Sequence, residues 1–212
     1  MRAGYWRSVS HALNAFPNES FIDEMAVAAK QDPYAFRMAM LDKKPRFANV
    51  LKLAAEKAGW GGPLPAGRFR GIALMEGYDT YMAQVAEISV TNNEIRVHRV
   101  VAVADLGRMV NPDTVEAQIQ SSIAFGLSAA LGNQITLEKG RVQQSNFSDY
   151  PVLRMSEMPK IDVTLVSSAE KPGGIGEPAT ALIGPAVGNA LFAATGKRLR
   201  RMPFTAENIV KA

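Results

Sequence analysis

The chain contains 212 residues, of which 47% are hydrophobic, and its 24 basic and 20 acidic side chains give a net charge of +4. This length allows one large domain or two small ones, and the absence of cysteine excludes disulfides, thiolate nucleophiles and cysteine-ligated iron–sulfur clusters. The only two histidines, His11 and His98, lie far apart and leave almost no material for a zinc site. No stretch approaches the ~18 consecutive apolar residues of a membrane-spanning helix, so we predict a soluble chain without a membrane span.

Residues 18–60 are predicted to form three consecutive helices. Apolar residues recur at helical spacing in ESFIDEMAVAAKQ (residues 19–31), and that helix is expected to end before Pro33, because proline disfavours helical geometry in the residue before it. Asp32 can cap a second helix that has Pro33 at its first position. A third helix, RFANVLKLAAEKAGW (residues 46–60), is expected to stop at the following glycine cluster.

From Gly67 onward the sequence becomes rich in residues that favour strands. Residues 68–90 and 94–107 predict two long strands, and Asn92-Asn93 between them can adopt the positive φ angles of a tight hairpin turn. We therefore expect an antiparallel pair of strands in this part of the chain.

A helix over residues 111–131 is predicted next. Asn111 or Asp113 lies near its start, and Gly132 follows its end. The segment QITLEKGRVQQ then predicts a hairpin around Lys139-Gly140, and KIDVTLVSS predicts a further strand.

The last helix is expected to begin at Pro185 and to end at Gly196, because proline favours the first position of a helix and glycine the position after its end. The predicted order is therefore helices, strands, helix, strands and helix. This order predicts an α+β fold in which helices pack on an antiparallel sheet.

The stretch KPGGIGEPATALIGPAVGNALFAATGKRLRR (residues 171–201) contains the main candidate for a functional loop. Gly174, Gly176 and Ala179 satisfy the G-x-G-x-x-A pattern of a dinucleotide-binding turn after a strand. However, Pro178 removes an amide hydrogen where phosphates would need one, and no acidic residue lies about 20 positions downstream to bind the ribose. We therefore disfavour a nucleotide site.

Glu177 has two interpretations that the local sequence does not separate. It can be an ordinary charge near a helix start, where a carboxylate favours the helix dipole, with the glycines forming a turn. It can also be a general base that faces a bulky ligand, with the flexible backbone of residues 173–176 allowing the ligand to approach closely. The rest of the chain has to decide between them.

The basic run GKRLRR (residues 196–201) holds the excess positive charge of the chain. A nucleic-acid interface would show a broader basic face with interleaved aromatic residues. We therefore expect no nucleic-acid partner, and we interpret the run as a solvated helix end that complements the helix dipole.

Four segments in a fixed order carry a resemblance to a known family. They are WRSVSHALNAFPNESFIDEMA, which contains Arg7 and Glu19; DPYAFRMAML; VAVADLGRMVNPDTVEAQIQSSIAFGLSAAL; and GGIGEPATALIGPAVGNALFAATGKRLRRMPF. With these segments the sequence resembles the C-terminal part of the molybdenum-binding subunit of the xanthine dehydrogenase/aldehyde oxidase family. It is most similar to the branch that contains the isoquinoline 1-oxidoreductase beta subunit.

The resemblance implies a molybdenum–pterin cofactor, with the cytosine dinucleotide form as one variant, whose metal takes no ligand from the protein. Glu177 matches the family's general base, which takes a proton from the metal-bound hydroxide. The implied reaction hydroxylates an electron-poor carbon of an aldehyde or N-heterocycle with water-derived oxygen. The residues that match cofactor-binding positions are Arg7, Gln118, Ser121, Ser122, Gly174, Ile175 and Gly176.

Other matched residues are interpreted as structural. Gly107 is expected to form a turn and Asn111 to cap the following helix, while Asp105 and Pro112 belong to the same matched segment. His11 and His98 have no role that the resemblance implies.

The resemblance covers residues 1–212 as the C-terminal portion of a cofactor-binding domain, with residues 1–66 mainly helical, residues 67–212 mixed, and no independent second domain. We expect the chain to need an N-terminal half or a second molybdenum subunit, together with an iron–sulfur subunit, and to be inactive alone. It is then a natural split subunit, a truncated gene product or a cloned domain; the alternative is a non-catalytic structural or assembly module. The expected compartment is cytoplasmic, or periplasmic if a partner carries an export signal.

Overall fold

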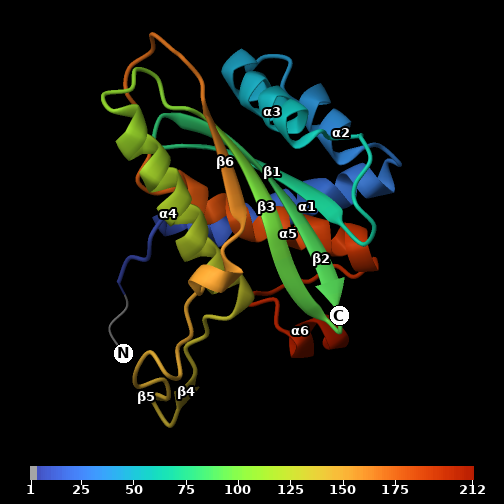
Figure 1. Ribbon diagram of the computed structural model, residues 1–212, viewed down its shortest axis with the longest axis vertical. Helices are drawn as coiled ribbons and strands as arrows, with labels where there is room; N and C mark the ends of the chain where they lie inside the picture. The colour runs from blue at the N-terminus through green and yellow to red at the C-terminus, as the bar shows by residue number, and fades with distance from the viewer. Residues whose placement is uncertain (1–3) are drawn as a thin grey trace.

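The centre of the structure is a four-stranded sheet with helices on both faces (Figure 1). The computed structural model describes residues 4–212. The α+β class predicted from the sequence is confirmed. The strands are β1 (Phe69–Gly77), β2 (Thr80–Thr91), β3 (Glu94–Asp105) and β6 (Lys160–Leu165), in the order β1-β2-β3-β6.

The first three strands form an antiparallel meander with two tight turns. Asn92-Asn93 forms the β2–β3 turn as predicted, with φ angles of 52° and 61°. The predicted single strand over residues 68–90 is wrong, because Tyr78 and Asp79 also adopt positive φ angles, both of 59°, and form a second hairpin turn. Tyrosine is an unusual residue for this backbone conformation, so no residue pattern marked the turn.

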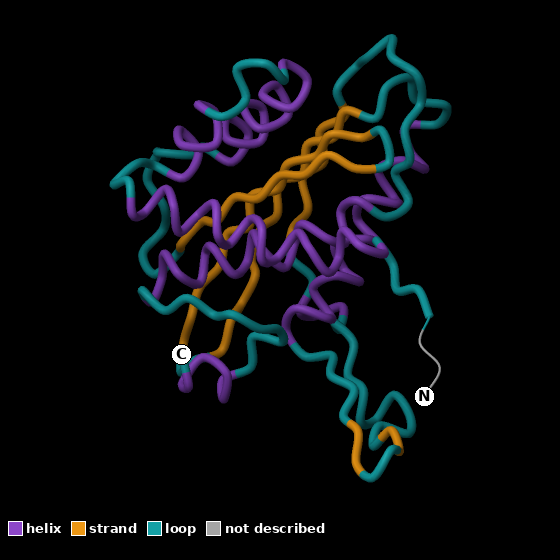
Figure 2. The backbone as a smooth tube through the Cα atoms, turned by 180° about the vertical axis from the view of Figure 1, so that it is seen from behind, coloured by secondary structure: helices purple, strands orange, loops and turns teal. Residues whose placement is uncertain are grey.

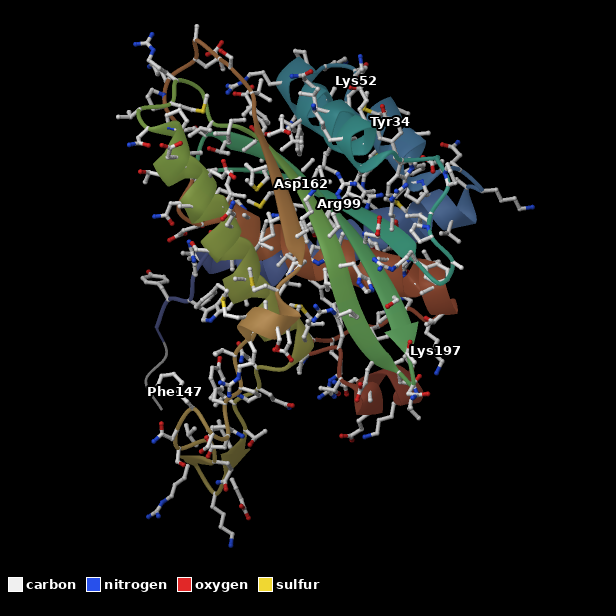
Figure 3. The ribbon with its side chains drawn as sticks, viewed as in Figure 1. Tyr34, Lys52, Arg99, Phe147, Asp162 and Lys197 are labelled. Atoms are coloured by element: carbon white, nitrogen blue, oxygen red, sulfur yellow. The ribbon has the colours of Figure 1, made fainter. Side chains whose placement is uncertain are left out.

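The edge strand β6 corrects the expectation of an entirely antiparallel sheet, because it runs parallel to residues 99–104 of β3. The long connection that contains α4 (Pro112–Leu131) returns the chain to the same end of the sheet, as parallel pairing requires. On the sheet surface, Arg99 Nε lies 2.6 Å from Asp162 Oδ2 and links the two parallel strands (Figure 3).

Three consecutive helices precede the sheet, as predicted. The first of them begins earlier than the predicted start at Glu19 and contains Pro17. Tertiary packing accounts for this extension, because Phe16 is buried against Phe204 with the ring centroids 5.5 Å apart. The bounds are α1 (Val9–Ala28), α2 (Pro33–Ala39) and α3 (Pro45–Ala58).

Across residues 4–212, no helix combines the length and the apolar character that crossing a bilayer would demand.

The two faces of the sheet carry separate hydrophobic clusters. Successive residues of a strand point to opposite faces, so Ile72 and Leu74 of β1 pack on the side of α3, while Ala73 and Met75 pack on the opposite side. That opposite cluster includes residues of α1, α4 and α5 (Pro178–Thr195). Seen from behind, helices lie across the strands (Figure 2). The strands are therefore covered on both sides.

The start of α5 differs from the prediction. The helix begins at Pro178, and Pro185, the predicted start, lies inside it. Both prolines suit a first helical position. The residues between them are buried against the rest of the protein, and this burial extends the helix back to Pro178. The end at Gly196 is as predicted. Gly71 lets α5 cross β1 closely, since a Cβ there would lie 2.2 Å from the carbonyl oxygen of Ala186.

An arm connects α4 to β6 and projects away from the sheet (Figures 1 and 2). It contains the short strands β4 (Leu137–Glu138) and β5 (Arg141–Val142), joined by the predicted turn at Lys139-Gly140, and the 3-10 helix η1 (Met155–Glu157). Phe147 lies on this arm with 77% of its surface exposed (Figure 3).

The basic run near the C-terminus corrects another expectation, because Arg198 is buried rather than solvated. Its side chain is 9% exposed, and its guanidinium lies 2.6 Å from the Asp23 carboxylate and 2.8 Å from the side-chain oxygen of Asn189. The buried carboxylate of Asp23 needs a cation, and Arg198 supplies one in addition to Arg37. Lys197 donates to backbone carbonyls of the last helix, α6 (Ala206–Lys211) (Figure 3). The run therefore anchors the C-terminal tail.

Candidate functional site

Segments that are far apart in the sequence meet at the start of α5. Arg7 and Ser8 come from the turn before α1, and Gln118 and Ser121 come from the exposed face of α4. The loop of residues 173–177 and the tip of the β1–β2 hairpin complete the group. The sequence-predicted site residues all lie in the first three of these segments.

Arg7 makes the contacts that join the segments. Its Nε and Nη2 atoms donate to the carbonyl oxygen of Gly176 at 2.9 Å and 2.6 Å. The same Nη2 lies 3.1 Å from Gln118 Oε1 and 3.2 Å from Ser121 Oγ. The planar guanidinium thus positions the loop before Glu177 relative to α4, which a lysine would not do with the same geometry.

Two serine hydroxyls hold the same loop from the protein interior. Ser8 is fully buried and donates to the carbonyl oxygen of Glu177 at 2.8 Å. Ser122, also fully buried, donates to the carbonyl oxygen of Gly176 at 3.2 Å. The backbone on both sides of the Gly176–Glu177 peptide is therefore fixed by side chains from α4 and from the turn before α1.

Glu177 itself occupies the N-cap position of α5 but its side chain does not cap the helix. The residue is half-buried, and among residues 4–212 its carboxylate forms no ion pair and no hydrogen bond of good geometry, although the Tyr78 phenol lies near it. The interpretation as a charge near a helix start is correct for its position. The carboxylate nevertheless remains available for another partner, which is what a general base requires.

Gly173 and Gly174 pack against the hairpin tip. A Cβ on Gly173 would lie 2.4 Å from the carbonyl oxygen of Asp79. The amide of Gly174 donates to the carbonyl oxygen of Tyr78 at 2.7 Å, and Thr80 Oγ1 donates to the carbonyl oxygen of Gly174 at 2.8 Å. Both backbone groups of Gly174 are therefore bonded within the protein, and its contact with a cofactor stays a prediction that would use neither of them.

The residues that follow Gly174 have backbone amides without an acceptor. The N–H groups of Ile175, Gly176 and Glu177 donate to no atom in the part of the chain that the structure describes. Free amides beside a helix N-terminus favour an anionic or strongly polar ligand group. Ile175 and Gly176 thus retain the capacity for the ligand contacts expected of them.

Tyr78 belongs to this site although sequence reasoning missed it. Its hydroxyl oxygen is buried and has no hydrogen-bond partner within residues 4–212. Burial, together with the nearby carboxylate of Glu177, raises the pKa of Tyr78 to about 12, although the Ser8 hydroxyl opposes the shift. No sequence signal located Tyr78. The hairpin turn at Tyr78-Asp79 comes to lie against the glycine loop only when the chain folds.

Asp105, Gly107 and Asn111 have the structural roles that the sequence predicted. Arg46 donates to the two carboxylate oxygens of Asp105 at 2.8 Å and 2.7 Å, and this pairing holds the pKa of Asp105 below its ordinary value. Gly107 forms a turn at a φ of 75°, and the Asn111 side chain caps α4 by accepting the amide of Thr114 at 3.0 Å.

An open pocket adjoins the site on the side of α4. Its volume is about 430 Å³, and its lining includes Arg7, Ser121, Phe125 and Tyr150. The Arg7 guanidinium lies 5.7 Å from the centre of the Phe125 ring, which gives the pocket one cationic and one aromatic wall. A second pocket of about 460 Å³ borders the β2–β3 turn and contains none of the predicted site residues.

Known proteins resemble this chain in both sequence and fold. The family model of the molybdopterin cofactor-binding domain matches residues 18–159. Isoquinoline 1-oxidoreductase subunit beta from Brevundimonas diminuta is 37% identical over 205 residues, which cover 94% of this chain and 26% of that protein. The membrane-bound aldehyde dehydrogenase of Gluconacetobacter polyoxogenes, whose name specifies pyrroloquinoline quinone, is 32% identical over 99% of this chain and 30% of that protein.

The solved structure of aldehyde oxidoreductase from Desulfovibrio gigas has the same fold. It superposes with a TM-score of 0.76 at 14% sequence identity and covers 98% of this chain and 41% of that one. In length, the chain spans between a quarter and a third of the two curated relatives. The fold is therefore shared, over a part of much longer proteins.

Proposed function

This chain belongs to the molybdopterin cofactor-binding domain family, and we propose that it forms the base-bearing part of a molybdenum hydroxylase. The assembled enzyme hydroxylates an electron-poor carbon of an aldehyde or N-heterocycle with oxygen from water. The observation that carries the proposal is the carboxylate of Glu177, which lacks a partner among residues 4–212 although side chains fix the backbone around it. Glu177 acts as the general base that removes a proton from the water-derived oxygen nucleophile.

The polar groups beside Glu177 fit a molybdenum–pterin group. Arg7, Gln118 and Ser121 offer donors and an acceptor at the protein surface next to an open pocket. The free amides of Ile175 and Gly176 supply further donors to the polar edge or the phosphate of such a cofactor, including its cytosine dinucleotide form. When bound, the cofactor supplies the two-electron redox chemistry. Ser122 acts indirectly, because its hydroxyl holds the Gly176 carbonyl.

Partner chains complete the proposed enzyme. Because the chain spans about a quarter of the length of a 37% identical relative, an N-terminal half or a second molybdenum subunit forms the remaining wall of the cofactor pocket. Iron–sulfur clusters reside on a separate subunit, because this chain contains no cysteine to ligate them. The chain is therefore inactive alone.

A second candidate is a structural or assembly module without catalysis. Co-expression with the products of neighbouring genes separates the two candidates. The purified complex is assayed for bound molybdenum and for bound quinone, since one relative is named for a quinone, and for dye-linked oxidation of N-heterocycles and aldehydes. Bound molybdenum with activity supports the hydroxylase. A stable complex without molybdenum under every condition of co-expression contradicts it.

A further inference from the structure

Two groups that lack partners lie close together at the candidate site. Within residues 4–212 the buried hydroxyl of Tyr78 makes no hydrogen bond of good geometry, and the nearby carboxylate of Glu177 accepts none. A buried hydroxyl that makes no hydrogen bond is costly, so such groups are rare in folded proteins. After burial, which has the larger effect, the nearby carboxylate also raises the pKa of the phenol. The two groups are therefore complementary.

The backbone holds Tyr78 against the loop that carries Glu177. The Gly174 amide donates to the Tyr78 carbonyl oxygen at 2.7 Å, and Thr80 Oγ1 donates to the Gly174 carbonyl oxygen at 2.8 Å. A Cβ on Gly174 would lie 3.1 Å from the Cβ of Tyr78, so the hairpin and the loop are in direct contact. The backbone that carries the Tyr78 phenol is thus fixed against the loop that carries Glu177.

The conformation of Tyr78 points to a constraint beyond turn formation. Its φ of 59° lies in the left-handed region, where glycine or asparagine is tolerated far better than a bulky aromatic residue. The ring contacts that of His11 with the centroids 4.9 Å apart, which braces the phenol on the side of α1. Local strain of this kind occurs where a side chain must be held in one place.

We propose that Tyr78 is a positioning residue for Glu177, whose phenol donates a hydrogen bond to the carboxylate and fixes its orientation toward the ligand. The inference rests on the proposed role of Glu177 as the base. The phenol remains protonated throughout, so it donates a hydrogen bond and does not transfer its proton. A carboxylate held in one rotamer loses less conformational freedom when the reacting atoms assemble.

Other titratable groups around the pair come from the beginning of the chain and, in the case of Asp79, from the hairpin tip itself. Arg7 binds the Gly176 carbonyl oxygen next to Glu177, and His11 contacts the Tyr78 ring. From α4 the adjoining side chain is the neutral amide of Gln118. An experiment on the pair must therefore separate the effect of Glu177 from those of Arg7 and His11, which it does by changing Glu177 alone.

The first test uses the full chain without cofactor. The ring carbon that bears the hydroxyl of Tyr78 is observed by NMR after labelling with ¹³C-tyrosine, and its resonance is assigned by its loss in Tyr78→Phe. At about pH 10.5, where an ordinary tyrosine is largely ionised, the wild-type resonance stays at the position of the neutral phenol. Glu177→Gln shifts the titration of this resonance to lower pH than in the wild type, because burial of the ring remains but the negative carboxylate is gone. Identical titration of Tyr78 in the two chains overturns the inference.

A second test uses the enzyme assembled with its partner subunits. Tyr78→Phe keeps the ring in place and is expected to lower kcat about tenfold with little change in KM, because the base is present but less well oriented. Tyr81→Phe is the matched control, since Tyr81 lies on the same hairpin and contacts Phe47 on the opposite face of the sheet, and it leaves kcat unchanged. An unchanged kcat in Tyr78→Phe overturns the inference.

The two tests also distinguish this inference from the proposed function. Full activity of Glu177→Gln removes the base assignment, whatever the titration of Tyr78 shows. Loss of activity in Glu177→Gln together with a Tyr78 resonance that ignores Glu177 keeps the base and removes the role of Tyr78.

Discussion

The guanidinium of Arg7 lies 2.6 Å from the carbonyl oxygen of Gly176, a contact between residues 169 positions apart in the chain. It ties the turn before α1 to the loop that precedes Glu177. Through Gln118 and Ser121 the same side chain also reaches α4. The proposed base is therefore held by groups from the beginning, the middle and the end of the sequence, and none of these segments forms the site alone.

Replacing Arg7 by lysine tests the guanidinium directly. Lysine keeps the charge but cannot donate to Gly176, Gln118 and Ser121 with one planar group. We expect the assembled enzyme to retain molybdenum about tenfold less well, as is usual for loss of a group that supports a cofactor site. Metal content per purified complex measures the effect. Arg141→Lys on the exposed β5 strand is the control, and equal metal content in both variants would count against the assignment.

Replacing Arg198 by alanine tests the anchoring of the C-terminal tail. Arg198 pairs with Asp23, which also lies 3.6 Å from the buried guanidinium of Arg37. Removing Arg198 leaves the buried Asp23 carboxylate with the more distant Arg37 as its cation. We therefore expect a loss of about 3 kcal/mol in the free energy of unfolding. Urea denaturation of the chain measures it. Arg200, with a side chain that is 69% exposed, is the control, and alanine there is expected to cost less than about 1 kcal/mol. Equal losses would show that Arg198 is no anchor.

The Arg46–Asp105 pair predicts a pH dependence of stability. Arg46 holds the pKa of Asp105 below its ordinary value of 3.8 in the folded chain. A carboxyl with a lowered pKa stabilises the fold above its ordinary pKa, and this contribution is lost as the pH falls through the lowered folded pKa. Asp105→Asn is therefore expected to destabilise the chain more at about pH 7 than at about pH 3. Unfolding free energies of both chains at the two pH values give the comparison, and a difference that does not vary with pH would contradict it.

Much of the fold could be predicted because local chemistry specifies it. Asn92-Asn93 and Lys139-Gly140 marked their turns, Asn111 marked the start of α4, and Gly196 marked the end of α5. The errors arose where tertiary contacts override local preference. Burial extends α5 back to Pro178.

The site could be predicted only in part. Family resemblance, which the comparisons confirm, located Arg7, Gln118 and Glu177, and the structure brings these three residues together. Two features depend on the fold and left no pattern in the sequence. Tyr78 reaches the site because a hairpin tip packs on the glycine loop. Arg198 is buried because Asp23, 175 positions earlier, faces it in the folded chain.

The most direct test of the account is the turnover of Glu177→Gln in the assembled, molybdenum-loaded complex. Glutamine preserves the size of the side chain but cannot accept the proton, so kcat is expected to fall by a factor of about 10² to 10⁴ while the molybdenum content stays unchanged. Glu170→Gln, which neutralises an exposed carboxylate in the segment leading to the same loop, is the matched control and is expected to retain activity. Wild-type turnover by Glu177→Gln with a full complement of molybdenum would contradict the assignment of Glu177 as the base.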